Sequence, residues 1–169
     1  AGVQMWQLGN GQSMKPIVGA YQKLRFAGDS KALYAGNIKG GLVKLALDGT
    51  IEAQVPDTPG PDAEYPPMAA LPGLALSATG TLINLRQVLE QQPDGFFTPK
   101  IWLEIVTLSG SHTLELAKDI RDVLSLDISD DGRFVAYAGQ TDTNYVALTD
   151  VRDLTPGAGG FSATQDGSD

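Results

Sequence analysis

The sequence is poorest in the residues that build metal and thiol sites, because it has no cysteine and a single histidine, His112. The lack of thiols excludes disulfides, thiolate metal sites and cysteine nucleophiles, and one histidine cannot form a multi-histidine metal site. Neither a phosphate-binding P-loop nor a Gly-x-Ser-x-Gly nucleophile turn occurs. We therefore assign no catalytic residue and no cofactor from the sequence.

Positive charge and long apolar runs are also scarce. The chain has twelve Lys and Arg residues against twenty Asp and Glu residues, and the resulting net charge of −8 disfavours binding to a phosphate backbone. No run approaches the roughly 18 apolar residues that a membrane-spanning helix needs. We expect neither nucleic acid nor membrane insertion. The compartment stays open, although the small first residue, Ala1, favours a periplasmic or extracellular location because signal cleavage leaves such a residue.

Glycine and proline are plentiful, with 20 and 10 residues spread along the chain, as is typical of short strands joined by frequent turns. The most informative feature is an internal repeat of three segments that align without gaps and begin 50 and 52 residues apart. Each has apolar residues two apart, then a polar turn, then a second apolar run, which is the pattern of a β-hairpin. The segments are Leu24–Ala35, Leu74–Leu85 and Leu126–Tyr137.

The turns of these segments hold residues suited to tight turns. Gly80 and Gly132 stand where a positive φ is often needed, and Ser30 takes the matching place in the first copy. In the third copy we predict a two-residue hairpin turn at Asp131-Gly132. Alternation on both sides of that turn predicts four core residues: Leu126, Ile128, Val135 and Tyr137.

Further strands follow the hairpins. A third strand is predicted in residues 41–49, 101–110 and 145–152, and a fourth in Thr50–Val55 and His112–Ala117. Four antiparallel strands in roughly 40 to 50 residues are the unit of a β-propeller blade. The predicted fold class is all-β, with four-stranded antiparallel blades of a β-propeller, about three of them present. An open β-sandwich is the alternative.

Two stretches resemble known propeller sequences. Residues 125–137 read SLDISDDGRFVAY and look like the S-x-D-G-[RK]-x-[IVL]-A-Y signature of TolB-type and WD-repeat-like propellers. Residues 3–11 read VQMWQLGNG and are similar to a V-x-x-W-x-L-x-x-G strand that ends many such repeats. The Trp-Asp dipeptide and Gly-His pair of strict WD repeats are missing, so the TolB-type or prolyl-peptidase-type propeller is the nearer comparison. The resemblance implies the fold and leaves the function open, because these propellers serve as scaffolds, receptors and accessory domains of enzymes alike.

Register against the repeat predicts the organisation of the chain. Residues 1–154 hold the blades and 155–169 form a flexible tail rich in Gly, Ser and Asp. The predicted units are a half blade at 3–18 and blades at 21–55, 72–118 and 121–152. About three blades are fewer than the four to eight that close a ring. We expect another chain, another copy of this chain, or sequence removed by processing to supply the rest.

An insertion between the second and third strands of the second full blade, Arg86 to Lys100, is predicted to be a projecting loop. It carries Phe96 and Phe97 beside Asp94-Gly95, and exposed aromatic rings of this kind anchor interfaces. Folding of the two rings back onto their own blade is the alternative.

The first strand carries a second predicted partner surface. Met5, Trp6 and Leu8 are expected near an uncovered sheet edge and therefore against polypeptide from beyond these 169 residues. The proline-rich stretch from Pro56 to Pro72 is expected to be an extended crossing between blades.

One weak metal candidate remains. Asp127, Ser129 and Asp131 match the opening spacing of a calcium loop, but the twelfth position is Ala138 rather than a bidentate glutamate. A strand that ends in a hairpin explains the same residues, so we predict no metal, with calcium as a minor alternative. His112 follows a Ser-Gly turn, where histidine is usually a surface residue.

Two functions fit these features. The first is a non-catalytic, protein-binding propeller segment that is part of a larger assembly, because open sheet edges accept a further strand. The alternative is one chain of a processed or multi-subunit propeller-containing hydrolase or peptidase whose catalytic residues lie on another segment.

Overall fold

The computed structural model describes residues 2–7, 11–13, 16–57, 73–115, 122–140 and 144–150. Every helix or strand assigned within these ranges is a β-strand, so the predicted all-β class is confirmed. The described residues include no helix of the length and apolar character needed to cross a bilayer.

The strands occur in this order: β1 (Gly2–Val3), β2 (Trp6–Gln7), β3 (Gln12–Ser13), β4 (Ile17–Val18), β5 (Lys23–Phe26), β6 (Ala32–Gly36), β7 (Leu42–Ala46), β8 (Ile51–Val55), β9 (Leu74–Leu76), β10 (Leu82–Gln91), β11 (Phe97–Thr107), β12 (Gly110–Glu115), β13 (Asp122–Ile128), β14 (Phe134–Gln140) and β15 (Asn144–Asp150).

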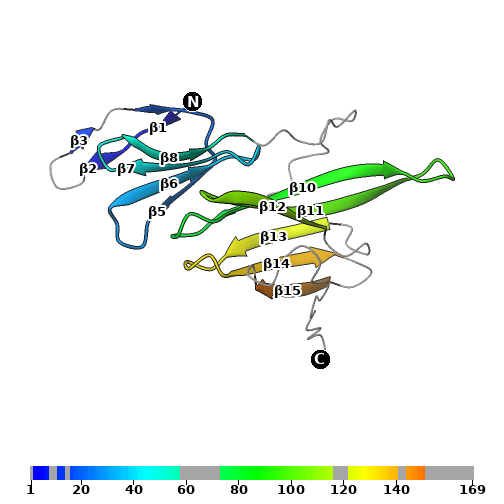
Figure 1. Ribbon diagram of the computed structural model, residues 1–169. Coiled ribbons are helices and arrows are strands. Elements are labelled where there is room, and N and C mark those ends of the chain that lie inside the picture. The colour runs from blue at the N-terminus through cyan, green and yellow to red at the C-terminus, as the bar shows by residue number, and fades with distance from the viewer. Residues whose placement is uncertain are drawn as a thin grey trace.

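The strands form sheets in which neighbours in sequence are neighbours in space. Sheet β5-β6-β7-β8 and sheet β9-β10-β11-β12 are four-stranded and antiparallel, and β13-β14-β15 continues the pattern with three strands. Near the N-terminus β1 pairs with β4, and β2 pairs with β3. Figure 1 shows the three sheets following one another along the chain, with the N-terminal strands beside the first. This arrangement fits the four-strand unit that the repeat predicted.

The first hairpin turn of each sheet is a β-turn closed by a backbone hydrogen bond. Ser30 N–H donates to the Ala27 carbonyl at 2.8 Å, and Gly132 N–H donates to the Ser129 carbonyl at 2.8 Å. The last residue of each turn has a positive φ: 58° at Ser30, 83° at Gly80 and 74° at Gly132. The gapless alignment of the repeat therefore matches the left-handed positions, and Ser30 is the only described non-glycine residue with a positive φ.

The turn at Asp131-Gly132 is longer than the predicted two-residue turn. Ile128 pairs with Val135, and Ser129 N–H donates to the Phe134 carbonyl at 2.9 Å, so four residues separate Ser129 from Phe134. The Ser129 hydroxyl explains the difference, because it accepts the N–H groups of Arg133 at 3.2 Å and Phe134 at 2.9 Å. A side chain thus satisfies donors at the end of the turn.

The predicted core residues of this hairpin are confirmed. Ile128, Val135 and Tyr137 are buried, and Leu126 is partly buried against the same cluster. In this cluster the third sheet packs on the second four-stranded sheet, which contributes Ile83 among other residues.

Two further clusters repeat this packing. Tyr34 and Leu42 of the first four-stranded sheet meet Leu74 and Leu76 of the second. The opposite face of the first sheet packs against the N-terminal strands. That cluster contains these buried residues: Val3, Ile17, Leu33, Ala35, Val43 and Leu45. The two four-stranded sheets therefore contribute apolar residues to neighbours on both faces, and the third sheet packs through one face on the second, which is how stacked repeats share a core.

The insertion at residues 86–100 lengthens two strands rather than forming the predicted long loop. Strands β10 and β11 stay paired from Leu82↔Val106 to Gln91↔Phe97, and only the turn at 92–96 is irregular. Pro99 is tolerated in β11 because the described part of β12 pairs with Trp102–Thr107, so the missing N–H of Pro99 disrupts no second ladder among the described strands. Figure 1 shows this hairpin projecting beyond the other strands.

A buried polar network joins the two four-stranded sheets. Glu104 is almost fully buried, and its Oε2 accepts a hydrogen bond from Arg86 Nε at 2.7 Å and one from Asn84 Nδ2 at 3.1 Å. Asn84 Nδ2 also donates to the carbonyl of Ile38, in the β6–β7 turn, at 2.6 Å. The carboxylate thus orients an amide that binds the backbone of the neighbouring sheet.

We expect Gly132→Ala to lower the melting temperature more than Gly95→Ala does. Both positions have positive φ, which costs an L-residue about 1–2 kcal/mol. A Cβ at Gly95 would meet open space. A Cβ at Gly132 would lie 2.5 Å from Thr81 Oγ1 and 2.6 Å from Thr79 Oγ1, in the β9–β10 turn of the neighbouring sheet. Thermal unfolding followed by circular dichroism checks this, and equal losses would show that the turn does not press on the neighbouring sheet.

We expect Glu104→Gln to destabilise the protein by about 3 kcal/mol, because it leaves a largely buried guanidinium without its counter-ion. Glu52→Gln is the matched control. Glu52 pairs with Lys44 at 2.8 Å but both side chains are about a third or more exposed, so its loss costs at most about 1 kcal/mol. Urea unfolding of both variants gives the comparison. Equal effects would contradict a special role for the buried pair.

Candidate interaction surfaces

The hairpin turns of the three sheets are joined by a repeated backbone hydrogen bond. Gly28 N–H donates to the Ala78 carbonyl at 3.2 Å, and Ala78 N–H donates to the Asp130 carbonyl at 3.0 Å. The three residues occupy the same position of the aligned repeat. The turn of each sheet therefore donates to the turn of the next, at intervals of about fifty residues.

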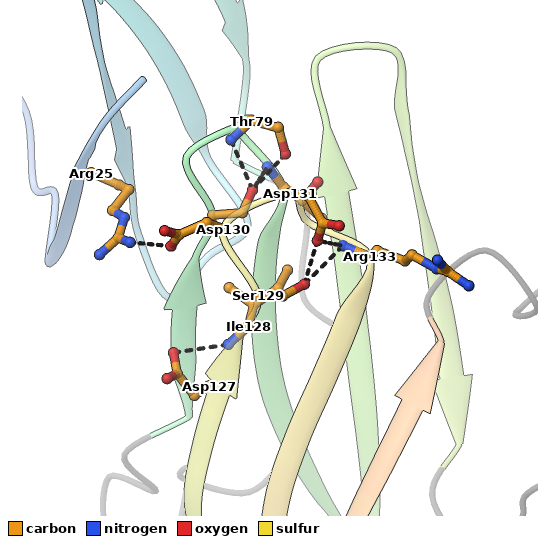
Figure 2. A network of polar contacts seen from close by, with 10 residues as sticks. Arg25, Thr79, Asp127, Ile128, Ser129, Asp130, Asp131 and Arg133 are labelled. Carbon is orange, nitrogen blue, oxygen red and sulfur yellow. Dashed lines mark hydrogen bonds and ion pairs between the residues drawn. The ribbon is translucent and has the colours of Figure 1, made fainter. Parts of the chain in front are cut away.

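A salt bridge spans the same region. Arg25 Nη2 pairs with Asp130 Oδ1, which joins β5 of the first four-stranded sheet to the turn of the third (Figure 2). Both side chains are substantially exposed, so the pair orients the turns more than it stabilises them.

Small residues allow the turns to approach this closely. A side chain at Gly80 would overlap the ring of Tyr34, and one at Gly132 would meet the hydroxyls of Ser77, Thr79 and Thr81. These hydroxyls are themselves ordered, since Ser77 Oγ lies 2.9 Å from Thr79 Oγ1 and accepts the Thr81 N–H at 2.8 Å. Glycine is thus required by the neighbouring sheet as well as by backbone conformation.

The carboxylates of the third turn are engaged by the turn itself. Asp131 Oδ1 accepts the Ser129 hydroxyl at 2.6 Å and the Arg133 N–H at 3.0 Å. The Ser129 hydrogen bond, followed by that from Arg133, holds the pKa of Asp131 below its usual value. Asp127 Oδ1 instead accepts the Ile128 N–H at 2.8 Å. The three residues proposed as a calcium candidate therefore have other partners, and no metal-binding group of three or more acidic or histidine side chains occurs in the described ranges.

Strand β5 presents apolar side chains to solvent. Leu24 is 51% exposed and Phe26 is 55% exposed. They lie opposite Ala35 and Leu33 in the ladder, so they share the sheet face that the N-terminal strands cover over β6 and β7. The cover thus ends before it reaches β5.

The second four-stranded sheet shows what such a face looks like when it is covered. Leu74 and Leu76 hold the places of Leu24 and Phe26 in the repeat, but they are only 7% and 8% exposed. The first four-stranded sheet buries them through Tyr34 and Leu42. An equivalent neighbour is absent from β5 in the described structure, which leaves an apolar strip on this edge strand.

The aromatic residues predicted to bind partners differ in their environments. Phe96 is 74% exposed in the turn between β10 and β11, where its N–H is held by Asp94 Oδ1 at 3.1 Å. Phe97 begins β11 opposite Gln91. Phe96 is thus exposed in the turn of this hairpin, whereas the side chain of Phe97 lies outside the described set, and partner binding by either ring stays a prediction.

The N-terminal residues divide in the same way. Trp6 is 60% exposed, and Met5 is half-buried against the cluster between the N-terminal strands and the first four-stranded sheet. Leu8 lies outside the described residues. Their binding of a partner remains a prediction. His112 lies on β12 opposite Ile105 and is exposed, as expected of a surface histidine.

Sequence reasoning missed the strip at Leu24 and Phe26, because alternation predicts a core face and says nothing of what covers it. It also missed Glu104. A usable signal was present, since Glu104 is the one charged residue in the run IWLEIV, residues 101–106.

Comparison with known proteins gives structural likeness only. No family model and no curated protein sequence matches the chain. Among solved structures, TolB from Acinetobacter baumannii is similar over 89% of this chain and 46% of its own, with 11% identity and a TM-score of 0.32. The structure of U3-55K is similar over 78% of this chain and 49% of its own, with 14% identity and a TM-score of 0.30. The chain thus spans about half the length of each.

Proposed function

We propose that this chain is a non-catalytic, protein-binding propeller segment that works as part of a larger assembly. The observation that carries the proposal is the placement of exposed aromatic side chains on ordered backbone. Among the residues whose exposure is described, Phe96 is the most exposed large apolar residue after Val18. Large apolar groups in water are costly, and an aromatic ring fixed in place is the usual anchor of a protein interface.

The turn around Phe96 is held in a defined conformation. Gln92 N–H donates to the Phe96 carbonyl at 2.7 Å, and Gly95 N–H donates to the Gln92 carbonyl at 2.9 Å. Gly95 has a φ of 87°, which suits glycine. Because the backbone is fixed before binding, little conformational entropy is lost when the ring enters a partner's pocket.

The character of the partner follows from the surroundings of the ring. Asp94 adds negative charge beside Phe96, and the whole chain carries a net charge of −8. Such a surface suits a protein with an apolar pocket and a neutral or basic rim, and disfavours a polyanion. Trp6 offers a second exposed ring on the N-terminal strands.

The test is the composition of the native particle. Affinity-tagged chain, expressed in its source cells and purified gently, is weighed intact by native mass spectrometry, and each component is identified. We expect a particle that contains at least one other polypeptide. Phe96→Ser should release or weaken one component by tenfold or more, which is the scale of losing an interface anchor.

Leu108→Ser is the matched control, because Leu108 is also an exposed apolar residue in a hairpin turn, the one between β11 and β12. It should leave the particle unchanged. A particle that contains this chain alone, or one that loses the component equally with either variant, would contradict the proposal.

A further inference from the structure

In the series of turn-to-turn hydrogen bonds, the first and the last turn each have one backbone group without a partner turn among the described residues. Within the described residues the Gly28 carbonyl receives no donor from a preceding turn, and the Asp130 N–H finds no acceptor in a following one. Between these ends the bond is made twice, from Gly28 to Ala78 and from Ala78 to Asp130. The chain therefore carries both halves of the same junction.

We propose that a second copy of this chain docks head-to-tail, placing the outer face of sheet β13-β14-β15 on the strip formed by Leu24 and Phe26. This goes beyond the proposed function and does not depend on it, because the partner is a copy of this chain and the surface is β5 rather than the turn at Phe96. The junction would repeat the contacts already described at the turns and at the first strand of the sheet, because the N-terminal strands occupy the same face over β6 and β7. Asp130 N–H of one copy would donate to the Gly28 carbonyl of the other.

The apolar strip fits this occupant. In the second four-stranded sheet the residues in the places of Leu24 and Phe26 are buried by the outer face of the sheet before it. The matching outer face of the third sheet carries Phe134, Ala136 and Ala138, which are half-buried. Within the part of the chain that the structure describes, apolar side chains of matching register are thus partly exposed on β5 and on β14, and their union would remove both from water.

Side-chain sizes at the junction are also complementary. Tyr34, opposite Arg25 in its ladder, requires glycine at position 80 of the next turn. Ala136, opposite Asp127, occupies the place of Tyr34 in the third sheet. The turn that would meet Ala136 holds Ser30 in the place of Gly80. Ala136, a small residue, would therefore face the one turn of the three that has a side chain, Ser30, at the positive-φ position.

The test uses two substitutions at opposite ends of the chain, Phe26→Asp and Ala136→Asp, with purified full chains in sedimentation velocity at increasing concentration. The wild-type chain should associate. Either variant alone should bind itself at least tenfold more weakly, because each copy has one damaged face and every junction needs two intact faces. An equimolar mixture of the two should form a dimer, since one junction in the mixture is intact.

Control variants separate this junction from other contacts. Ile51→Asp places the same charge on another half-exposed apolar residue, in β8, and should leave association unchanged. Asp130→Pro removes the N–H at a turn position that suits proline and should weaken association about fivefold or more relative to Asp130→Ala, which loses the same carboxylate but keeps the N–H. Leu24→Asp replaces Phe26→Asp if melting shows that the latter does not fold.

A monomeric wild-type chain would overturn the proposal, as would unimpaired association of the folded Phe26→Asp or Leu24→Asp variant, or a mixture that stays monomeric. None of these results bears on a different protein held through Phe96. The two proposals therefore fail separately.

Discussion

The hydrogen bond between turns of successive sheets is the constraint on which the rest of the structure depends. It fixes the first turn of each sheet against the next, from Gly28 to Ala78 and from Ala78 to Asp130. Once two turns are fixed, the strands that leave them have a set orientation, and the sheet faces meet over their length. The apolar clusters between sheets fill the space that this geometry defines.

The close approach of the turns explains where the sequence uses small and hydroxylated residues. Gly80 admits the ring of Tyr34, and Gly132 lies over the hydroxyls of Ser77, Thr79 and Thr81. The Ser77 hydroxyl accepts the N–H groups of Thr79 and Thr81 in its own turn, and it lies within hydrogen-bond distance of the Thr79 hydroxyl. The residues that such a junction would bury on the first four-stranded sheet, Leu24 and Phe26, are exposed because no described sheet covers β5. The proposed docking of a second copy follows from this exposed strip.

The parts of the fold that are local in sequence could be predicted. Alternating apolar residues and turn-forming residues predicted the hairpins, because both signals act within about ten residues. The bond from Ala78 to Asp130 could not be predicted, since it joins backbone groups that carry no side-chain signal and lie fifty-two residues apart. The four-residue turn was missed because the Ser129 hydroxyl replaces ladder hydrogen bonds, and the long β10–β11 hairpin was missed because polar residues and Pro99 resemble a loop. Of the predicted partner residues, the exposed position of Phe96 was foreseen and the exposure of β5 was not.

Amide hydrogen exchange measured by NMR tests the central role of the turn-to-turn bond most directly. Gly28 is the second residue of the β-turn that begins at Ala27, and Ala78 holds the same position in the turn that begins at Ser77. Neither amide is bonded within its own turn, so both would exchange rapidly if the sheets did not meet there. The account predicts that both are protected to nearly the same extent as the amides of the strands β6 and β10, and that the protection of Ala78 falls when Gly132→Ala pushes the turns apart. Exchange of Gly28 and Ala78 at the rate of an open turn, such as that at Asp94, would contradict it.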